Sequence, residues 1–330
     1  MPARRADQRR VPCAPLLAAR PRTAQVCRPV DASPLTWTTR ALWILLPLTL
    51  GALLSDASSG TDAATGITVA GWAVWALGLF SSFVATPSAL VLFRLAAPLP
   101  LLVGMVPAWS DLPGSLGWIG LANAAAVAVL AMSADLGSGF INGSAYGDEQ
   151  RVSLRTPTSL LIGPIQVVWV CTAVPLPLAL SLLVQGQWVG GALLGVVGAV
   201  LAVAGFTALS RLARRWLVLV PAGLTIVDDM ALAEPILLKR TAIVRLGPAP
   251  ADSDAMDLTV GAGGLILQAD LNEPVVAHRV EVGLLCDDGR GKGVFSLASG
   301  EVILAFEGEV ARQLLRRICV AAGFVADLIA

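Results

Sequence analysis

The sequence predicts a membrane all-α helical bundle of about six transmembrane helices, followed by a C-terminal, mainly β cytosolic domain that ends in one helix. No Asp, Glu, Lys or Arg occurs between residues 156 and 210, and a charge at the centre of a membrane helix costs about 2.5–3.5 kcal/mol on insertion scales. Only 14% of the chain is charged, against about 25% in soluble domains. After Arg215 the apolar period changes from helical to alternating.

Hydropathy over windows of about 19 residues places the transmembrane domain at residues 36–210. The first span is the shortest, and at about 1.5 Å per residue it covers only part of a ~30 Å hydrocarbon core. It has to include residues 37–39 to cross the bilayer, and a re-entrant segment is the alternative. Pro47 is expected to kink it. The six expected spans are residues 41–54, 67–85, 88–109, 116–134, 159–184 and 188–209.

The positions of Lys and Arg predict the orientation. Eight arginines lie in residues 1–40, two follow the fourth span and three follow the sixth, whereas the loops at residues 55–66, 110–115 and 185–187 contain neither Lys nor Arg. Because basic residues beside spans are retained on the cytoplasmic side, we expect a multi-pass protein of the cell membrane with both termini cytoplasmic. Five of the nine tryptophans lie near span ends, where they suit the headgroup layer. The other four are expected only to pack.

Residues 1–35 are expected to form a disordered basic tail, rich in Pro, Ala and Arg. Its arginines could touch anionic lipid, and a solvated tail or a start codon assigned too far upstream are the alternatives. The five cysteines are irregularly spaced, and the one histidine, His278, has no neighbouring ligands in the sequence. Hydrolysis would need a nucleophile with a base or a metal with ligands. We therefore expect no catalytic residue, no metal site, no cofactor and no enzymatic activity.

Arg94 is the charged residue that lies deep within an expected span. Ionisable groups at membrane depth are functional candidates by default. At about 1.5 Å per residue it lies about 12 Å from Thr86, so its side chain could also reach back to the cytosolic interface. Asp135, at the end of the fourth span, is the candidate partner in an intramembrane polar pair. The alternatives are a structural role and a ligand or gating role.

The sixth span is rich in glycine. Gly191 and Gly195 form a small-xxx-small pattern, which lets two helix backbones approach closely. This pattern could form a homodimer seam, and the alternative is packing against the fifth span within one chain.

The loop at residues 137–156 is the most polar segment of the membrane half. Its glycines indicate flexibility, and it contains mixed charges beside the one tyrosine of the chain. A plain connector would need fewer residues, although a connector remains the alternative. We expect this loop to dock on a partner or on the C-terminal domain. The candidate docking residues are Tyr146, Asp148, Glu149, Arg151 and Arg155.

Residues 216–330 are expected to form a β domain of about seven short strands. The first two surround a Pro-Ala-Gly turn at residues 221–223, and residues 234–246 suggest a third with a polar break. Further strands are expected at residues 257–260, 265–268, 274–279, 294–297 and 302–306. An apolar stripe from Val310 to Ala322 indicates a closing amphipathic helix.

This order of strands and helix resembles the pleckstrin-homology-like (PH-like) domains that bacteria attach to membrane spans. The segments GSAYGDEQR and RRWLVLVPAGLTIVDDMALAEPILLKR are similar to those of an uncharacterised actinobacterial family of multi-pass membrane proteins, and the excess of Arg over Lys fits a GC-rich source. The resemblance implies a PH-like barrel and transfers no activity or site residue. The domain has nine Lys and Arg against fifteen Asp and Glu, which disfavours anionic lipid headgroups and nucleic acid.

These observations predict a non-enzymatic scaffold or regulator at the cell membrane. The bilayer and a cytosolic or membrane protein are its expected partners, and the 137–156 loop with the β domain is its expected docking surface. The alternative is a channel or transporter subunit whose path passes Arg94 and the proline-containing spans three and five.

Overall fold

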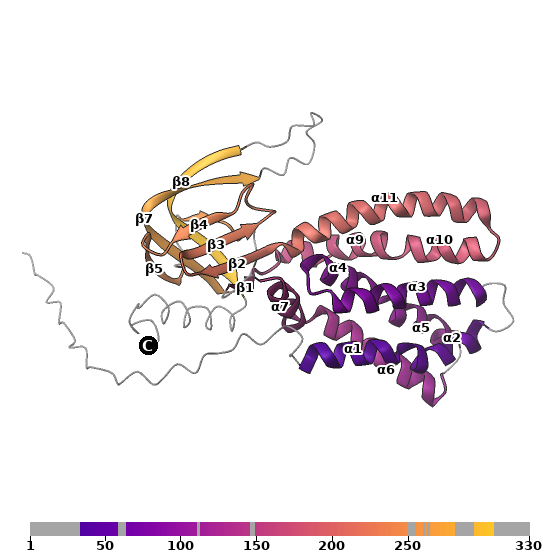
Figure 1. Ribbon diagram of the computed structural model, residues 1–330. Coiled ribbons are helices and arrows are strands. Elements are labelled where there is room, and N and C mark those ends of the chain that lie inside the picture. The colour runs from indigo at the N-terminus through magenta and orange to yellow at the C-terminus, as the bar shows by residue number, and fades with distance from the viewer. Residues whose placement is uncertain are drawn as a thin grey trace, which may run out of the picture.

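The computed structural model describes residues 34–58, 64–110, 113–145, 149–249, 255–259, 262, 265–280 and 294–306. The helices lie at one end of the molecule and the strands at the other, with α7 (Ala134–Gly143) between them (Figure 1). The expected tail at residues 1–35 lies almost entirely outside this part of the chain, as does the expected helix at residues 310–322.

In these ranges, six helical stretches are long and apolar enough to cross a bilayer. Their number agrees with the prediction of about six spans, and their length and composition fit a multi-pass membrane protein. The stretches are Pro34–Ser55, Ala64–Phe83, Pro87–Val106, Ser115–Met132, Pro164–Val184 and Trp188–Ala213.

The first span is longer than the sequence predicted. Helix α1 (Pro34–Thr49) begins seven positions before Ala41, and α2 (Gly51–Ser58) continues it. Arg40, which we had placed in the N-terminal arm, is therefore a helical residue within this span.

Prolines divide two of the spans into two helices each. Span three consists of α4 (Pro87–Ala96) and α5 (Leu99–Ser110), and span five of α9 (Pro164–Ala173) and α10 (Pro175–Val184). The other spans are α3 (Ala64–Phe83), α6 (Ser115–Met132) and α11 (Trp188–Ala213). Each division follows from the missing proline N–H, which cannot complete the helical ladder.

The start of span three is as predicted and that of span five is not. Thr86 accepts a hydrogen bond on its side chain from Ala89 N–H at 3.2 Å, with Pro87 in the first turn. Span five was expected from residue 159, but only the short α8 (Thr158–Leu161) begins there. Gly163 then takes a left-handed φ of 109°, and Gln166 Oε1 accepts from its N–H at 2.9 Å. The spanning helix thus begins at Pro164.

Spans five and six form a hairpin on the flank of the other helices. Helix α10 packs against α11 and α3, and α11 also contacts α4 and α9 (Figure 1). The main helical core lies around Trp43, Phe93, Val127 and Phe140, contributed by α1, α4, α6 and α7. Only 11% of the apolar window of α11 is buried within the protein, so most of this helix faces outward.

Two four-stranded sheets form the β domain. Their strand orders are β1-β2-β3-β4 and β5-β7-β8-β6. Most neighbours are antiparallel, and β6 pairs with β8 in parallel. The strands are β1 (Gln150–Ser153), β2 (Arg215–Val220), β3 (Gly223–Asp228), β4 (Ile236–Lys239), β5 (Ile243–Pro248), β6 (Met256–Asp257), β7 (Leu265–Val280) and β8 (Val294–Phe306).

The two sheets share one apolar core, to which Leu217 and Ile226 contribute from the first sheet and Leu267 from the second. The predicted hairpin at residues 221–223 is confirmed as the β2–β3 turn. The polar break at residues 240–242 separates two strands, β4 and β5, where we had expected one. Conversely, β7 and β8 each join two stretches that were predicted as separate strands. Among the strands that the structure describes, the sheets do not close into a barrel.

Candidate functional site

The predicted docking loop is a folded part of the junction between the helices and the sheets. Ser133 Oγ accepts from Leu136 N–H at 3.3 Å and begins α7. Leu136 and Phe140 of this helix are buried in the helical core. The chain then enters β1, which pairs with β2 in the first sheet. The pairing joins this segment to the C-terminal domain, whereas docking on a partner stays a prediction.

Asn142 of α7 binds the outer edge of β1. Arg151 N–H donates to Asn142 Oδ1 at 2.8 Å, and Asn142 Nδ2 donates to Arg151 O at 2.9 Å. The amide therefore occupies the place that the backbone of a further strand would take. An edge strand with open N–H and C=O groups invites unwanted pairing, and α7 covers this position of β1.

The structure brings some of the candidate docking residues together. Arg151 forms an ion pair with Glu149 at 3.3 Å, and its guanidinium lies 5.9 Å from the ring centroid of Trp216 on β2. Arg155 has an exposed side chain, while its carbonyl accepts from Arg215 Nη1 at 3.3 Å. The two remaining candidates, Tyr146 and Asp148, lie outside the described residues.

A buried ion pair completes this junction. Arg215, the first residue of β2, donates from Nε and Nη2 to Asp228 Oδ2 at 2.9 and 2.8 Å. Both side chains are at most 2% exposed. Asp228 Oδ1 accepts from the N–H groups of Met230 and Ala231. We did not identify this pair from the sequence, although the predicted hairpin places Arg215 and Asp228 opposite each other.

Arg94 binds the end of a neighbouring helix. Its Nε donates to Ala131 O at 2.9 Å and its Nη2 to Ser133 O at 3.2 Å, at the C-terminal end of α6. The last carbonyls of a helix lack intrahelical donors and carry partial negative charge. Asp135 lies two residues further on, in the first turn of α7. Both residues are described, and no ion pair joins them. The guanidinium is directed to the carbonyls instead.

Arg40 has the same role at another helix end. Its Nε and Nη2 donate to Ser82 O at 3.1 and 2.9 Å, near the C-terminus of α3. The guanidinium lies 5.0 Å from the ring centroid of Trp37 and 4.7 Å from that of Phe83. The side chain is buried. The C-terminal ends of α3 and α6 therefore each receive an arginine. The sequence analysis missed this role of Arg40, and the signal that points to it is the Trp37–Arg40 spacing of about one helical turn.

Two indoles bond to backbone carbonyls that proline leaves without a donor. Pro47 cannot donate to Trp43 O, and Trp75 Nε1 donates to this oxygen at 3.0 Å. Pro98 likewise cannot donate to Arg94 O, and Trp169 Nε1 donates there at 3.1 Å. Trp43 Nε1 in turn donates to Trp75 O at 3.0 Å. The prediction that the tryptophans within the spans only pack is therefore wrong for Trp43, Trp75 and Trp169.

Four glycines of α11 face span five, namely Gly191, Gly195, Gly198 and Gly205. A methyl group at Gly191 would lie 2.7 Å from Leu183 Cγ, and one at Gly198 would lie 3.0 Å from Pro175 Cβ. At Gly195 the nearest atom would be Ala179 Cβ at 3.8 Å. Gly191 therefore packs against span five within one chain, which was the alternative to a homodimer seam. A homodimer seam through Gly191 and Gly195 stays a prediction, although Gly191 is already buried within the chain.

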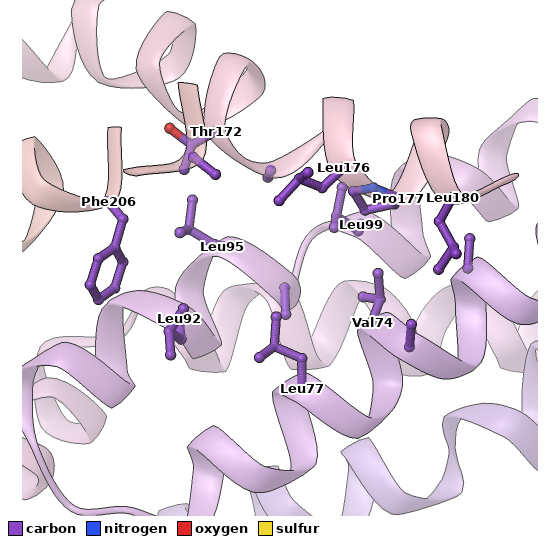
Figure 2. Close-up of a pocket in the computed structure, with 15 residues that line it drawn as sticks. Val74, Leu77, Leu92, Leu95, Leu99, Thr172, Leu176, Pro177, Leu180 and Phe206 are labelled. Carbon is purple, nitrogen blue, oxygen red and sulfur yellow. The ribbon is translucent and has the colours of Figure 1, made fainter. Parts of the chain in front are cut away.

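An apolar cavity of about 260 Å³ lies between spans two, three, five and six. Figure 2 shows Leu77 of α3 and Leu95 of α4 on one wall and Leu176 of α10 opposite. No lining residue carries a charge, and the one lining hydroxyl, Thr172 Oγ1, donates to Val168 O at 2.6 Å. Spans three and five thus line a cavity, as the transporter alternative requires, but its chemistry does not suit an ion.

Comparison with protein-family models, with curated proteins and with solved structures finds no match to this chain. The resemblance to the actinobacterial membrane family and to PH-like domains therefore stays a prediction. The described residues contain no group of three or more His, Cys, Asp or Glu side chains that could hold a metal ion.

Proposed function

We propose that this protein is a non-enzymatic scaffold or regulator that holds a cytosolic β domain in a defined position on the inner face of the cell membrane. The observation that carries the proposal is the pairing of β1 with β2. Strand β1 follows spans one to four, whereas β2 follows span six directly. One sheet therefore joins two separate exits from the bundle.

The contacts around this sheet limit the motion of the β domain. Asn142 links β1 to α7, and Arg215 links β2 both to Asp228 and to the carbonyl of Arg155. A domain that served only as a mobile appendage would need a single flexible linker. A domain with two short connections presents its surface to partners in one orientation relative to the bilayer.

In this proposal the β domain is a PH-like module whose closing helix is the apolar stripe at residues 310–322. The acidic balance of residues 216–330 favours a protein partner over anionic lipid. The partner surface comprises the half-buried Glu149 and Arg151, the exposed Arg155 and the adjoining face of the β domain.

Proximity labelling from the C-terminus of the full chain tests this proposal. The labelled proteins are compared with those of a variant in which residues 149–155 are replaced by a Gly/Ser linker of equal length. A chain with the same kind of replacement at residues 59–63 is the control. We expect the first replacement to remove a defined set of cytosolic or membrane proteins and the control to retain it. Identical sets in all three chains would contradict the proposal.

The orientation is tested with compartment-specific reporters at the two ends. Both termini should report the cytoplasm, because the N-terminal arm, the loop after the fourth span and the segment after the sixth span each carry arginines. Opposite signals would overturn the six-span topology.

The transporter alternative makes a different prediction for Arg94. If this residue lined a path, Arg94→Ala would change solute flux in reconstituted vesicles at unchanged expression. If Arg94 serves only to donate hydrogen bonds to the C-terminal carbonyls of α6, the substitution lowers stability and leaves flux unchanged.

A further inference from the structure

We propose that the cavity between spans two, three, five and six is a binding site for one acyl chain of a bilayer phospholipid. This inference is independent of the scaffold proposal. It rests on the position of the cavity, the chemistry of its lining and the exposure of its walls.

The cavity lies at the depth of the hydrocarbon. Every lining residue belongs to one of the helices α3, α4, α5, α9, α10 and α11, and none belongs to a loop between spans. Phe206 and Leu92 line it toward the cytosolic ends of their helices, and Ala70 and Leu180 toward the outer ends. The cavity is therefore elongated along the direction in which an acyl chain lies.

The chemistry of the lining excludes water as a stable occupant. A buried water needs two to four polar partners, and the hydroxyl of Thr172 already donates to Val168 O. An apolar cavity of about 150 Å³ in a soluble protein stays dry and takes up benzene. The present cavity is larger, and an empty space of its size would destabilise the packing around it.

The walls are accessible from the lipid phase. Leu77 on α3 is 45% exposed and Leu176 on α10 is 40% exposed, and both line the cavity. Figure 2 shows their side chains at opposite walls. An acyl chain can reach these exposed side chains from the bilayer without crossing a polar surface, whereas an aqueous solute would have to cross hydrocarbon first.

The kinks in spans three and five shape the site. Pro98 separates α4 from α5, and Pro175 begins α10. Leu95 and Leu99 lie on either side of the first kink, and Ala173 and Leu176 on either side of the second. Both proline breaks therefore lie beside the cavity.

Photo-crosslinking of the full chain in phospholipid nanodiscs tests the proposal. The probe is a phosphatidylcholine with a diazirine in the middle of one acyl chain, and labelled residues are identified by peptide mass spectrometry. We expect Leu95 and Leu176 to be labelled several-fold more than Leu193 and Val196, which lie on the exposed face of α11. Ordinary boundary lipid would label all four to a similar extent, and that result would overturn the proposal.

A cavity-filling variant gives an independent measurement. Ala73 lines the cavity and is exposed, so Ala73→Phe adds bulk there without entering the buried core. Ala199→Phe makes the same change on the exposed face of α11, outside the cavity. We expect the first variant to lose most labelling of Leu95 and Leu176 and the second to retain it. Equal labelling in both variants would refute the site, and so would labelling of Thr172 by a membrane-impermeant, water-soluble diazirine. The unmodified chain decides the question if Ala73→Phe fails to fold.

Discussion

Trp43 and Trp75 each donate an indole N–H to the backbone carbonyl of the other residue, at 3.0 Å in both directions. These two hydrogen bonds join spans one and two near the middle of the bundle. Its origin is Pro47, which leaves Trp43 O without the usual donor four residues on. Within hydrocarbon, no water is present to satisfy that oxygen. The indole N–H of Trp75 therefore replaces the backbone donor that Pro47 removes from this helix.

Trp75→Phe should lower the free energy of unfolding by about 1 kcal/mol, a typical size for a hydrogen bond between membrane helices. In the background of Pro47→Ala, where residue 47 can again donate to Trp43 O, the same change should cost much less. Both costs are measured by reversible unfolding in detergent. Equal costs in the two backgrounds would show that the bond to Trp43 O is unrelated to the proline.

Gly78 permits the close contact of α3 with Trp43. A methyl group at this position would overlap the indole ring of Trp43, which is fully buried. Gly78→Ala should therefore destabilise the bundle by about 1–3 kcal/mol, as overpacked cores do. Gly71→Ala is the matched control on the same helix, since nothing lies within 4 Å of the added methyl. The two thermal midpoints should differ clearly, and matching midpoints would argue against the contact.

Arg94→Met removes the donors to Ala131 O and Ser133 O but keeps a long apolar side chain. The loss should be about 2 kcal/mol, because charge-assisted hydrogen bonds at a helix C-terminus contribute about that much. Arg155→Met, at an exposed side chain, should change stability by less than about 0.5 kcal/mol. Unfolding of both variants in detergent measures the difference. A stable Arg94→Met protein with altered flux would favour the transporter alternative.

The Arg215–Asp228 pair should be far more sensitive than the exposed pair beside it. Asp228→Asn leaves Arg215 buried without its counter-ion, which typically costs about 3–5 kcal/mol. Arg214 and Asp229 lie 3.7 Å apart, with side chains 51% and 36% exposed, so Asp229→Asn should cost no more than about 1 kcal/mol. Hydrogen exchange of residues 215–228 in the full chain compares the two variants. Similar exchange in both would contradict the buried pairing.

The helical half of the fold was predictable because lipid imposes a simple rule on charge and length. The span count follows from the lengths of the apolar stretches. The Thr86 start of span three, and in the other half the β2–β3 hairpin, follow from patterns of a few consecutive residues. The start of span five did not follow, since Gly163 interrupts an apolar run that hydropathy treats as continuous. Arg40 was misplaced because a charge at the edge of a span has the same hydropathy whether it caps a helix or lies in solvent.

The candidate site was predictable only in part. The 137–156 loop was expected to dock, but strand β1 within it was not predicted. A strand of four residues in a polar, glycine-rich segment has no periodicity long enough to be recognised. Arg94 was recognised as unusual, but its partners are backbone carbonyls, which carry no sequence signal. The apolar cavity arises from the packing of four spans, and none of its residues differs in type from those that face lipid.

The pairing of β1 with β2 is the central claim, and a disulfide measures it most directly. In a chain without its native cysteines, Ser153→Cys is combined with Trp216→Cys, which the register places directly opposite each other. The control combines Ser153→Cys with Leu217→Cys, whose side chain points to the other face of the sheet. Mild oxidation in membranes, read out by peptide mass spectrometry, should crosslink the first pair and leave the control largely reduced. Failure of the first pair to crosslink, or equal crosslinking of both, would contradict the account.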